Sequence, residues 1–376
     1  MAAGLQNRVV RIARPIDGLP GPDDFEIRVE PVPEPGEGQA LVRTIYISIA
    51  PGVRPLMPYA GERPDVAQDS SAGRVDASAD AVPNPSRIRV GEAMRAGMVP
   101  SDSKFAGGTV GRVIASRHPD FRVGDYAFGG RYWQDYEAID GASAIRLDPA
   151  ELPIEADLGL IGRSAFTGWV GYRRICNARP GETILVSAAA GSVGMLVVQL
   201  AKADGLHVVG IASGADKCAF VTRELGADAC IDRMGEDVGA ALDRLCPAGV
   251  DIYFDNVGGA VQRPIFDRLK PFGRLIVCGM AASYCGGGDT QLPTGIILGK
   301  RLRIEGFVVL DYDDDYPAFR SEIARLWREG RIHYRQLVYE GLESAPRALA
   351  DCLSGRSSGG KILVQVAPDD SRAERS

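Results

Sequence analysis

Histidine and closely spaced cysteine are scarce in this chain, which argues against a metal site and a disulfide framework. Its 376 residues include three histidines, His118, His207 and His333, and none of them clusters with a cysteine. The seven cysteines all lie between residues 176 and 352, and no two form a Cys-x-x-Cys pair. Zinc ligands and disulfide frameworks have recognisable spacings. We therefore predict no metal and no disulfide network, with cysteines acting as small buried side chains.

The chain also lacks a long apolar run, an apolar leader and an excess of positive charge. No stretch reaches the roughly 18 apolar residues that a membrane helix needs, and the N-terminus has no signal-peptide core. A net charge of −6 disfavours nucleic acid or an anionic membrane as partner. Hydrophobic residues make up 45% and charged residues 24%, as in ordinary soluble proteins. We expect a cytoplasmic, two-domain enzyme that acts on a small molecule.

The first part of the chain is predicted to be all-β. Alternating apolar and polar residues indicate strands at residues 9–13, 25–29, 39–49, 108–116 and 121–128. Short strands with frequent turns favour a barrel. Residues 59–91 have no hydrophobic period and are rich in Asp, Ser, Ala and Pro. A loop of this length is either a lid over the substrate or slack chain.

The second part alternates strands with helices and predicts a doubly wound parallel sheet. Helices are expected at residues 154–160 and 165–174, strands at 183–187, 207–212, 229–231, 250–256, 274–278 and 301–310, and helix starts near 192, 216, 235 and 259. An amphipathic helix at 316–330 precedes a strand, a helix and a strand at 336–340, 344–353 and 361–366. This tail is predicted to return to the first domain. The predicted domains are residues 1–150 with 311–376, and residues 151–310.

The strand, small-residue turn and helix at residues 182–204 predict a dinucleotide site. The turn reads Ala188-Ala189-Ala190-Gly191-Ser192-Val193-Gly194. Its glycines allow a pyrophosphate to approach the backbone, and the N–H groups at the helix start attract the phosphates. The candidate cofactor residues are Ala190, Gly191, Ser192, Val193 and Gly194. An ordinary turn remains the alternative, because the first motif position is Ala188 rather than glycine.

The end of the second strand of this fold indicates the type of nicotinamide cofactor. An NAD site usually carries Asp or Glu there, whereas this strand ends Ile211-Ala212-Ser213. Ser213, Lys217 and Arg233 offer a hydroxyl and two cations, which suit a 2′-phosphate. We therefore predict NADPH over NADH. The alternative for Lys217 is a solvated lysine at the start of a helix.

These motifs resemble the zinc-independent medium-chain dehydrogenase/reductase superfamily, in particular its leukotriene B4 dehydrogenase / prostaglandin reductase / alkenal double-bond reductase family. The resemblance covers nearly the whole chain and is most specific in the Ser-Ala-Ala-Ala-Gly-x-Val-Gly and Phe-Asp-Asn-Val-Gly-Gly runs. The matching segments are residues 33–38, 115–121, 124–125, 133–136, 186–194, 210–212 with Lys217, 253–259, 278–279, 300–303, 306–307 and 340–342.

The resemblance implies a GroES-like β-barrel domain plus a Rossmann domain, with the active site between them. It implies transfer of a hydride from NADPH to an activated C=C bond without a metal, in a homodimer whose Rossmann sheets join edge to edge. By the same resemblance, Tyr284 hydrogen-bonds the nicotinamide ribose or the substrate oxygen. The residues that it places beside the nicotinamide are Thr167, Asn256, Val257, Cys278 and Gly279.

The departures from the family pattern lie on the substrate side. The family's Asp-Pro-Tyr-Met-Arg stretch has become residues 50–54, in which Arg54 remains. We expect Arg54, Trp133 and Tyr284 to contact a large, conjugated substrate, although an aromatic such as Trp133 is more often a core residue. Two alternatives stay open. One is a reductive cyclase of specialised metabolism, in which hydride addition triggers ring closure. The other is a non-catalytic NADPH-binding redox sensor.

Overall fold

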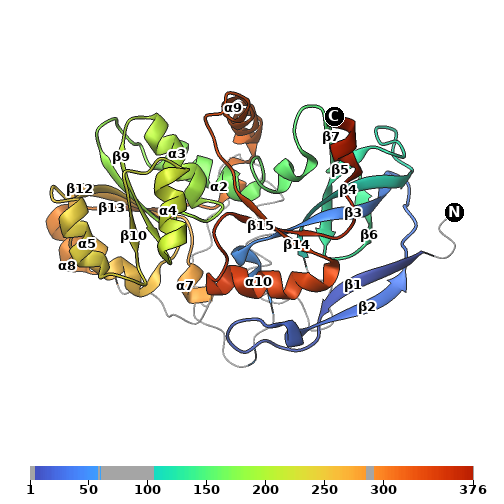
Figure 1. Ribbon diagram of the computed structural model, residues 1–376, viewed down its shortest axis with the longest axis horizontal. Coiled ribbons are helices and arrows are strands. Elements are labelled where there is room, and N and C mark those ends of the chain that lie inside the picture. Colours follow the sequence, from blue (N-terminus) through green and yellow to red (C-terminus); the bar gives the residue numbers. More distant parts are fainter. Residues whose placement is uncertain (1–4, 58–59, 61–105, 285–291, 376) are drawn as a thin grey trace, which may run out of the picture.

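The computed structural model describes residues 5–57, 60, 106–284 and 292–375, which fold around two large sheets (Figure 1). The predicted loop at residues 59–91 lies outside the described residues, apart from Ala60. One sheet is antiparallel over most of its strands and has seven strands, and the other is parallel and has six. This arrangement confirms the predicted combination of a β domain and a doubly wound α/β domain.

The seven-stranded sheet has the order β14-β15-β3-β4-β5-β7, and β6 also pairs with β3. Its strands are β3 (Gln39–Ile49), β4 (Ala106–Ser116), β5 (Tyr126–Tyr132), β6 (Tyr136–Asp140), β7 (Ile145–Leu147), β14 (Gln336–Glu340) and β15 (Lys361–Gln365). A separate antiparallel pair is formed by β1 (Gln6–Ile12) and β2 (Phe25–Pro31), linked through η1 (Pro22–Asp24). The C-terminal tail thus returns to the first sheet, as predicted.

The six-stranded sheet is parallel and has the order β10-β9-β8-β11-β12-β13. Its strands are β8 (Thr183–Ser187), β9 (His207–Ala212), β10 (Ala229–Asp232), β11 (Val250–Asp255), β12 (Leu269–Val277) and β13 (Arg303–Gly306). The helices around it are α3 (Gly194–Ala203), α4 (Ala215–Arg223), α5 (Val238–Leu245), η5 (Gly259–Gln262), α6 (Arg263–Phe266) and α8 (Thr294–Lys300). Most of these bounds lie within three residues of the sequence prediction.

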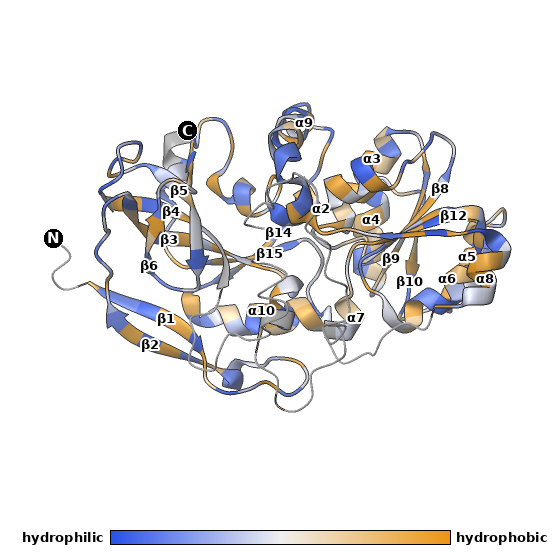
Figure 2. Ribbon diagram, turned by 180° about the vertical axis from the view of Figure 1, so that it is seen from behind, coloured by the Kyte–Doolittle hydropathy of each residue, from blue (hydrophilic) through white to orange (hydrophobic). Residues whose placement is uncertain are grey.

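Both faces of the parallel sheet are covered because its strands are apolar on both sides. In β8, Ile184 and Val186 point into one hydrophobic cluster with residues of α3 and α4. Leu185, between them, points into a second cluster with residues of α5 and α6. Alternation along a strand sends successive side chains to opposite faces, and a strand buried on both faces needs apolar residues throughout. Figure 2 shows this hydrophobic colouring along the strands and on the helices that flank them.

The predicted strand at residues 301–310 is wrong in its length. Only Arg303–Gly306 (β13) pairs with β12, and the chain then forms a 3₁₀ helix, η6 (Val309–Asp315). Phe307 leaves the strand direction and packs against the larger hydrophobic cluster of the parallel sheet. Arg301 before the strand has a left-handed backbone conformation with φ of +52° and ends α8. The apolar and β-branched composition of residues 301–310 therefore predicted a strand longer than the four residues that pair at the edge of the sheet.

Three other sequence-predicted elements differ in type or position. Residues 154–160 form a 3₁₀ helix, η3 (Ile154–Leu158), rather than an α-helix. Residues 165–174 form α2 (Arg163–Val170), which continues as a π-helix, η4 (Gly171–Ile175). The strand expected at 121–128 begins only at Tyr126, because Gly124, with φ of +101°, forms a turn before it. The turn needs the left-handed region that glycine adopts readily.

Helix α9 (Tyr316–Arg328) belongs with the parallel-sheet half, which moves the predicted domain boundary at residue 311. Its buried residues Phe319, Ile323 and Leu326 lie in the same hydrophobic cluster as α2 and α3. Only after α9 does the chain cross to β14, η7 (Leu342–Ser344), α10 (Ala345–Ser354) and β15 of the first sheet. The last described segment, η8 (Asp370–Arg375), follows β15.

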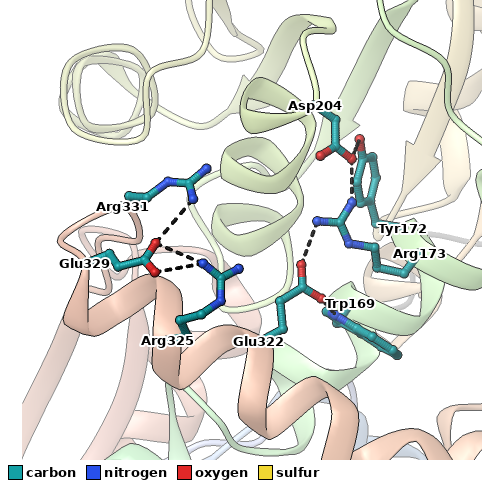
Figure 3. A network of polar contacts seen from close by, with 8 residues as sticks. All are labelled: Trp169, Tyr172, Arg173, Asp204, Glu322, Arg325, Glu329 and Arg331. Atoms are coloured by element: carbon teal, nitrogen blue, oxygen red, sulfur yellow. Dashed lines mark hydrogen bonds and ion pairs between the residues drawn. The ribbon is translucent and has the colours of Figure 1, made fainter.

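A polar network fastens α9 to the parallel-sheet half (Figure 3). Glu322 accepts hydrogen bonds from the Trp169 indole at 2.6 Å and from the Arg173 guanidinium at 2.7 Å. Arg173 also pairs with Asp204 at the end of α3, and the Tyr172 hydroxyl donates to the same carboxylate at 3.0 Å. Because Arg173 is shared between two carboxylates, one side chain joins α9, η4 and α3. Charge-assisted bonds of this type are stronger than neutral ones.

Lys361, the first residue of β15, carries a buried cation in the interior of the β half. Its ammonium is fully buried and donates to the Ile49 carbonyl at 2.6 Å. Among the described residues, no carboxylate pairs with it. Burial lowers the pKa of Lys361 to about 8, because removal from water penalises the charged form. The folded protein therefore bears a desolvation penalty that falls as the ammonium loses its proton.

We expect the stability difference between the protein and its Lys361→Met variant to depend on pH. Below pH 8 Lys361 is charged in both the folded and unfolded states. Between pH 8 and its ordinary pKa of 10.5 the folded state loses the proton first, so the free energy of unfolding rises. As the pH rises from 7 to 10, the free energy of unfolding measured with urea should rise for the unchanged protein relative to Lys361→Met. The difference should grow by up to about 3 kcal/mol. A difference that stays constant over this range would contradict the assignment.

Candidate active site

The turn between β8 and α3 has the close backbone approach that its sequence indicates. A Cβ atom on Gly194 would lie 2.4 Å from the Ala188 carbonyl oxygen, so only glycine fits there. Ala188 itself has φ of +48°, a left-handed conformation that is strained for alanine. Within the described residues, no side chain caps the start of α3. Gly191, Met195 and Leu196 donate their N–H groups to backbone carbonyls, so within the described residues it is the N–H groups of residues 192–194 that are available to an anion.

Gly191 differs from Gly194 in what it contributes. A Cβ atom there would lie 3.2 Å from the Ala188 carbonyl oxygen, a tight contact that a small shift could relieve. Packing within the protein therefore does not require glycine at this position. Ala190 is buried, whereas Gly191, Ser192 and Val193 are half-buried at the open side of the turn. An alanine turn thus supplies the same geometry as a glycine-rich one.

The carboxylate of Asp255 is the polar centre of the neighbouring strand end. It is fully buried and accepts hydrogen bonds from the Ser187 hydroxyl at 2.8 Å and the Tyr253 hydroxyl at 2.7 Å. It also accepts the backbone N–H groups of Val257 and Gly258 and the Gln262 amide. One side chain thereby fixes the end of β8, the end of β11 and the turn that follows β11. These donors satisfy a carboxylate that would be costly to bury without partners.

The loops after β8, β11 and β12 are bound to one another at the carboxyl edge of the sheet. Asn256 donates its amide to the Ser187 carbonyl at 2.7 Å, and Cys278 and Gly279 donate their N–H groups to the Asp255 carbonyl at 2.8 and 3.1 Å. A Cβ atom on Gly279 would lie 2.9 Å from the Asn256 carbonyl oxygen. The structure therefore brings Asn256, Val257, Cys278 and Gly279 together beside the turn. Ligands bind at this edge in open parallel sheets.

Three polar side chains gather at the ends of β9 and β10. Arg233 donates its Nε–H to the Ser213 hydroxyl oxygen at 2.9 Å, which leaves the hydroxyl proton of Ser213 free to donate. Lys217, half-buried in the first turn of α4, lies close enough to Arg233 for the two charges to repel. Burial, and then Arg233, lower the pKa of Lys217. Two cations and a hydroxyl at this strand end can receive a phosphate.

The segments expected around a substrate meet where the two halves face each other. Helix α7 (Ala281–Tyr284) packs against η2 (Pro51–Leu56), the turn that follows β3. Tyr284 ends α7, and its side chain lies outside the described part of the structure. Thr167 is half-buried in α2, and its hydroxyl donates to the Arg163 carbonyl at 2.9 Å. The backbone placement of Tyr284 thus suits an interdomain site.

The structure does not support the predicted substrate contacts of Arg54 and Trp133. Arg54 is fully buried, and its guanidinium donates to the Gly18 carbonyl at 2.8 and 3.2 Å. Trp133 is also fully buried and stacks on Phe25 with the ring centroids 6.3 Å apart. Both belong to the interior of the β half, Trp133 in a hydrophobic cluster with residues of β1 and β15. Residue type alone could not separate a buried guanidinium from one that binds substrate.

The sequence of residues 355–361 departs from the family pattern, which groups this run with the substrate side, but the structure brings it to the turn at residues 188–194, which we call the phosphate turn. Gly360 donates its N–H to the Ala190 carbonyl at 2.7 Å, and Lys217 donates its ammonium to the Gly355 carbonyl at 2.6 Å. Residues 355–360, which connect α10 to β15, thus touch two predicted cofactor-binding positions. The Gly-Gly-Lys run at the end of this segment was visible, but its partners lie far away in sequence. We call residues 355–360 the crossing segment.

The described residues contain neither a cluster of metal ligands nor a helix that could span a membrane. In that part of the chain, no group of three or more His, Cys, Asp or Glu side chains is arranged to hold a metal ion. Nor does any helix there have the length and apolarity needed to cross a membrane.

Comparison with known proteins gives matches along almost the whole chain. Residues 8–78 and 72–147 match a family described as the N-terminal domain of oxidoreductase, and residues 192–325 match the family described as zinc-binding dehydrogenase. The chain is 35% identical to an NADPH-dependent curcumin reductase of Escherichia coli, over 96% of this chain and 97% of that one. It is 31% identical to an NADP⁺-dependent 2-alkenal reductase of Nicotiana tabacum, over 97% and 99%.

A solved structure has the same fold. The chain matches the NADPH complex of CurA from Vibrio vulnificus with a TM-score of 0.80 and 31% identity, over 96% of this chain and 100% of that one. Together with the family matches, this similarity confirms the predicted fold of a barrel-type β domain and a Rossmann domain.

We expect Asp255→Ala to destabilise the protein by at least about 3 kcal/mol, because several buried donors lose their acceptor. Urea unfolding would measure the change. Asp243→Ala is the matched control, since Asp243 is exposed and pairs with Arg268 at the surface. Loss of this surface ion pair should lower the free energy of unfolding by less than about 1 kcal/mol. Equal destabilisation by the two variants would show that Asp255 is not the centre of this strand end.

Proposed function

Because this chain belongs to the zinc-independent medium-chain dehydrogenase/reductase family, we propose that it uses NADPH to reduce an activated C=C bond in a conjugated carbonyl compound. The observation that carries this proposal is the phosphate turn before α3 beside a strand end that has cations instead of a carboxylate. Two relatives are named as reductases of curcumin and of 2-alkenals, which are conjugated carbonyl compounds. A prostaglandin reductase and a pulegone reductase are also similar to this chain.

The residues on the carboxyl edge of the parallel sheet fit the cofactor by their chemistry. We assign the pyrophosphate to the turn at Ala190–Gly194, where N–H groups and small side chains meet. We assign the 2′-phosphate to Ser213, Lys217 and Arg233, and the nicotinamide end to Thr167, Asn256, Val257, Cys278 and Gly279. When bound, NADPH supplies the hydride. The buried Asp255 network holds these loops in place without contacting the cofactor.

Reduction of a conjugated carbonyl places negative charge on its oxygen. A hydrogen-bond donor aimed at that oxygen stabilises the transition state, and a phenol remains a donor at neutral pH. We propose Tyr284 for this role, either at the substrate oxygen or at the nicotinamide ribose. Its position at the end of α7, against η2, supports this assignment. With Arg54 and Trp133 in the interior, we propose that η2 and α7 border the substrate.

The substrate is proposed to be larger than a simple alkenal, because the chain departs from its family mainly on the substrate side. The other two hypotheses are a reductive cyclase and a non-catalytic NADPH-binding sensor. No feature of the described residues specifically favours either of them. Loss of NADPH absorbance with a panel of conjugated enones, quinones and polyenes tests the proposal. Binding of NADPH without turnover on any member of the panel would contradict it.

Tyr284→Phe is expected to lower kcat by about 10- to 1000-fold, the scale of losing one oxyanion donor. The dissociation constant of NADPH should change little, since the phosphates bind elsewhere. Tyr172→Phe is the control, because the Tyr172 hydroxyl donates to Asp204 at the opposite end of α3. This variant should keep its turnover. Full activity in Tyr284→Phe would remove the tyrosine from the mechanism.

We also propose a homodimer in which the parallel sheets join edge to edge. Strand β13 is at one edge of the parallel sheet, and Leu298 of the neighbouring α8 is 79% exposed. An unpaired edge beside apolar side chains tends to associate with another chain. Light scattering at micromolar concentration should give twice the chain mass of 40.1 kDa, and Leu298→Glu should shift the protein toward the single-chain mass of 40.1 kDa. A 40.1 kDa species for the unchanged protein would refute this assembly.

A further inference from the structure

Lys217 is held by the opposite half of the molecule. It lies in α4 of the parallel-sheet half, and its ammonium donates to the carbonyl of Gly355 at 2.6 Å. Gly355 ends α10, which packs on β3 and β15 of the β half. The two residues are 138 positions apart in the sequence. A side chain assigned to the cofactor's 2′-phosphate is therefore positioned by a backbone group of the other half.

The crossing segment also covers the stem of Lys217. A Cβ atom built on Gly359 would lie 3.7 Å from Cγ of Lys217 and 3.2 Å from Cβ of Ala190. Gly360, next in the chain, donates to the Ala190 carbonyl at 2.7 Å. The segment thus lies against both the phosphate turn and the lysine. The bond from Gly360 to Ala190 and the bond from Lys217 to Gly355 thus tie the two ends of the segment to the parallel-sheet half.

The Gly355 carbonyl is a suitable partner for this cation. It lies at the C-terminal end of α10, where the helix dipole favours positive charge. The negative end of the α10 dipole offsets the repulsion between Lys217 and Arg233. An ammonium has three donors, so it can keep this bond and still donate to a phosphate. Holding a long, flexible side chain in place before binding reduces the entropy lost on binding.

We propose that Gly355 is a specificity-determining residue, whose carbonyl holds the Lys217 ammonium where it meets the 2′-phosphate of NADPH. The β half thereby contributes to the choice of NADPH over NADH. This inference rests on the proposed function, because it takes Lys217 as a 2′-phosphate ligand. It adds that the preference depends on how α10 ends, and not only on the side chains around β9.

The conformation of Gly355 provides a test with a closely matched control. Gly355 has φ of +69° and Gly330, which follows α9, has φ of +67°, and neither has an atom within 4 Å of an added Cβ. A β-branched residue is a strong outlier at such angles, so Gly355→Val and Gly330→Val should each disturb one helix end. Both variants should lower Tm by similar amounts. Only Gly355→Val moves the carbonyl that holds Lys217.

The readout is the ratio of the dissociation constants of NADH and NADPH, measured by titration of the full-length protein. We expect Gly355→Val to lower this ratio by about 10-fold, on the scale of one lost charge-assisted contact. Gly330→Val should leave the ratio unchanged. Gly355→Ala, which disturbs the helix end less, should give an intermediate ratio and serves if the valine variant does not fold. An unchanged ratio in both Gly355 variants would overturn the proposal.

A double-variant cycle shows whether Gly355 acts through Lys217. Lys217→Met alone should lower the ratio by about 5- to 150-fold. In the Lys217→Met background, Gly355→Val should lower it no further, since the side chain that the carbonyl positions is gone. A further loss of the same size would show that Gly355 acts independently and would refute the positioning role. If Lys217→Met alone leaves the ratio unchanged, the assignment of Lys217 to the 2′-phosphate fails instead, together with this inference.

Discussion

The buried carboxylate of Asp255 is the interaction on which the cofactor edge depends. Its side chain collects donors from β8, β11 and the turn after β11, and its carbonyl collects the N–H groups that follow β12. A charge in the interior is tolerated only when donors surround it, so these strand ends cannot move apart separately. The same donors would each be costly to leave unpaired. Three loops that carry no regular structure of their own therefore have fixed positions relative to the phosphate turn.

The second constraint is the path of the chain between the two halves. After α9 the chain leaves the parallel-sheet half for β14 and α10, and the crossing segment then returns to touch Ala190 before β15 begins. Residues of the β half thus form part of the surroundings of the phosphate turn. The contact uses backbone groups of Gly360 and Ala190, and it requires glycine at position 360, where φ is +98° and an added Cβ atom would lie 2.7 Å from the Arg335 carbonyl oxygen. The cofactor site is therefore one of the places where the two halves are bonded to each other.

The sequence predicts the bounds of a strand well where the strand is buried. It predicts them poorly where the path of the backbone determines where a strand ends. Buried strands such as β8 and β9 are continuous apolar runs, and their predicted bounds match the structure. β13 was predicted too long because apolar residues continue past Gly306, although Phe307 turns into the core. The sequence located the phosphate turn by its spacing, but it could not show that Arg54 and Trp133 are buried. Nor could it pair Lys217 with Gly355, since that bond joins two segments that only the tertiary fold brings together.

Lys361 places a charged side chain in the interior of the β half, between β15 and β3. An apolar residue in its place would avoid the desolvation penalty, and buried charges often contribute little net stability. The ammonium, however, reaches one particular acceptor, the carbonyl of Ile49 at the end of β3. Ile49 pairs with Ile362, so this bond specifies the register of β15 against β3 at the point where η2 begins. A shift of one residue would place the ammonium beside a different group and reverse the faces of β15.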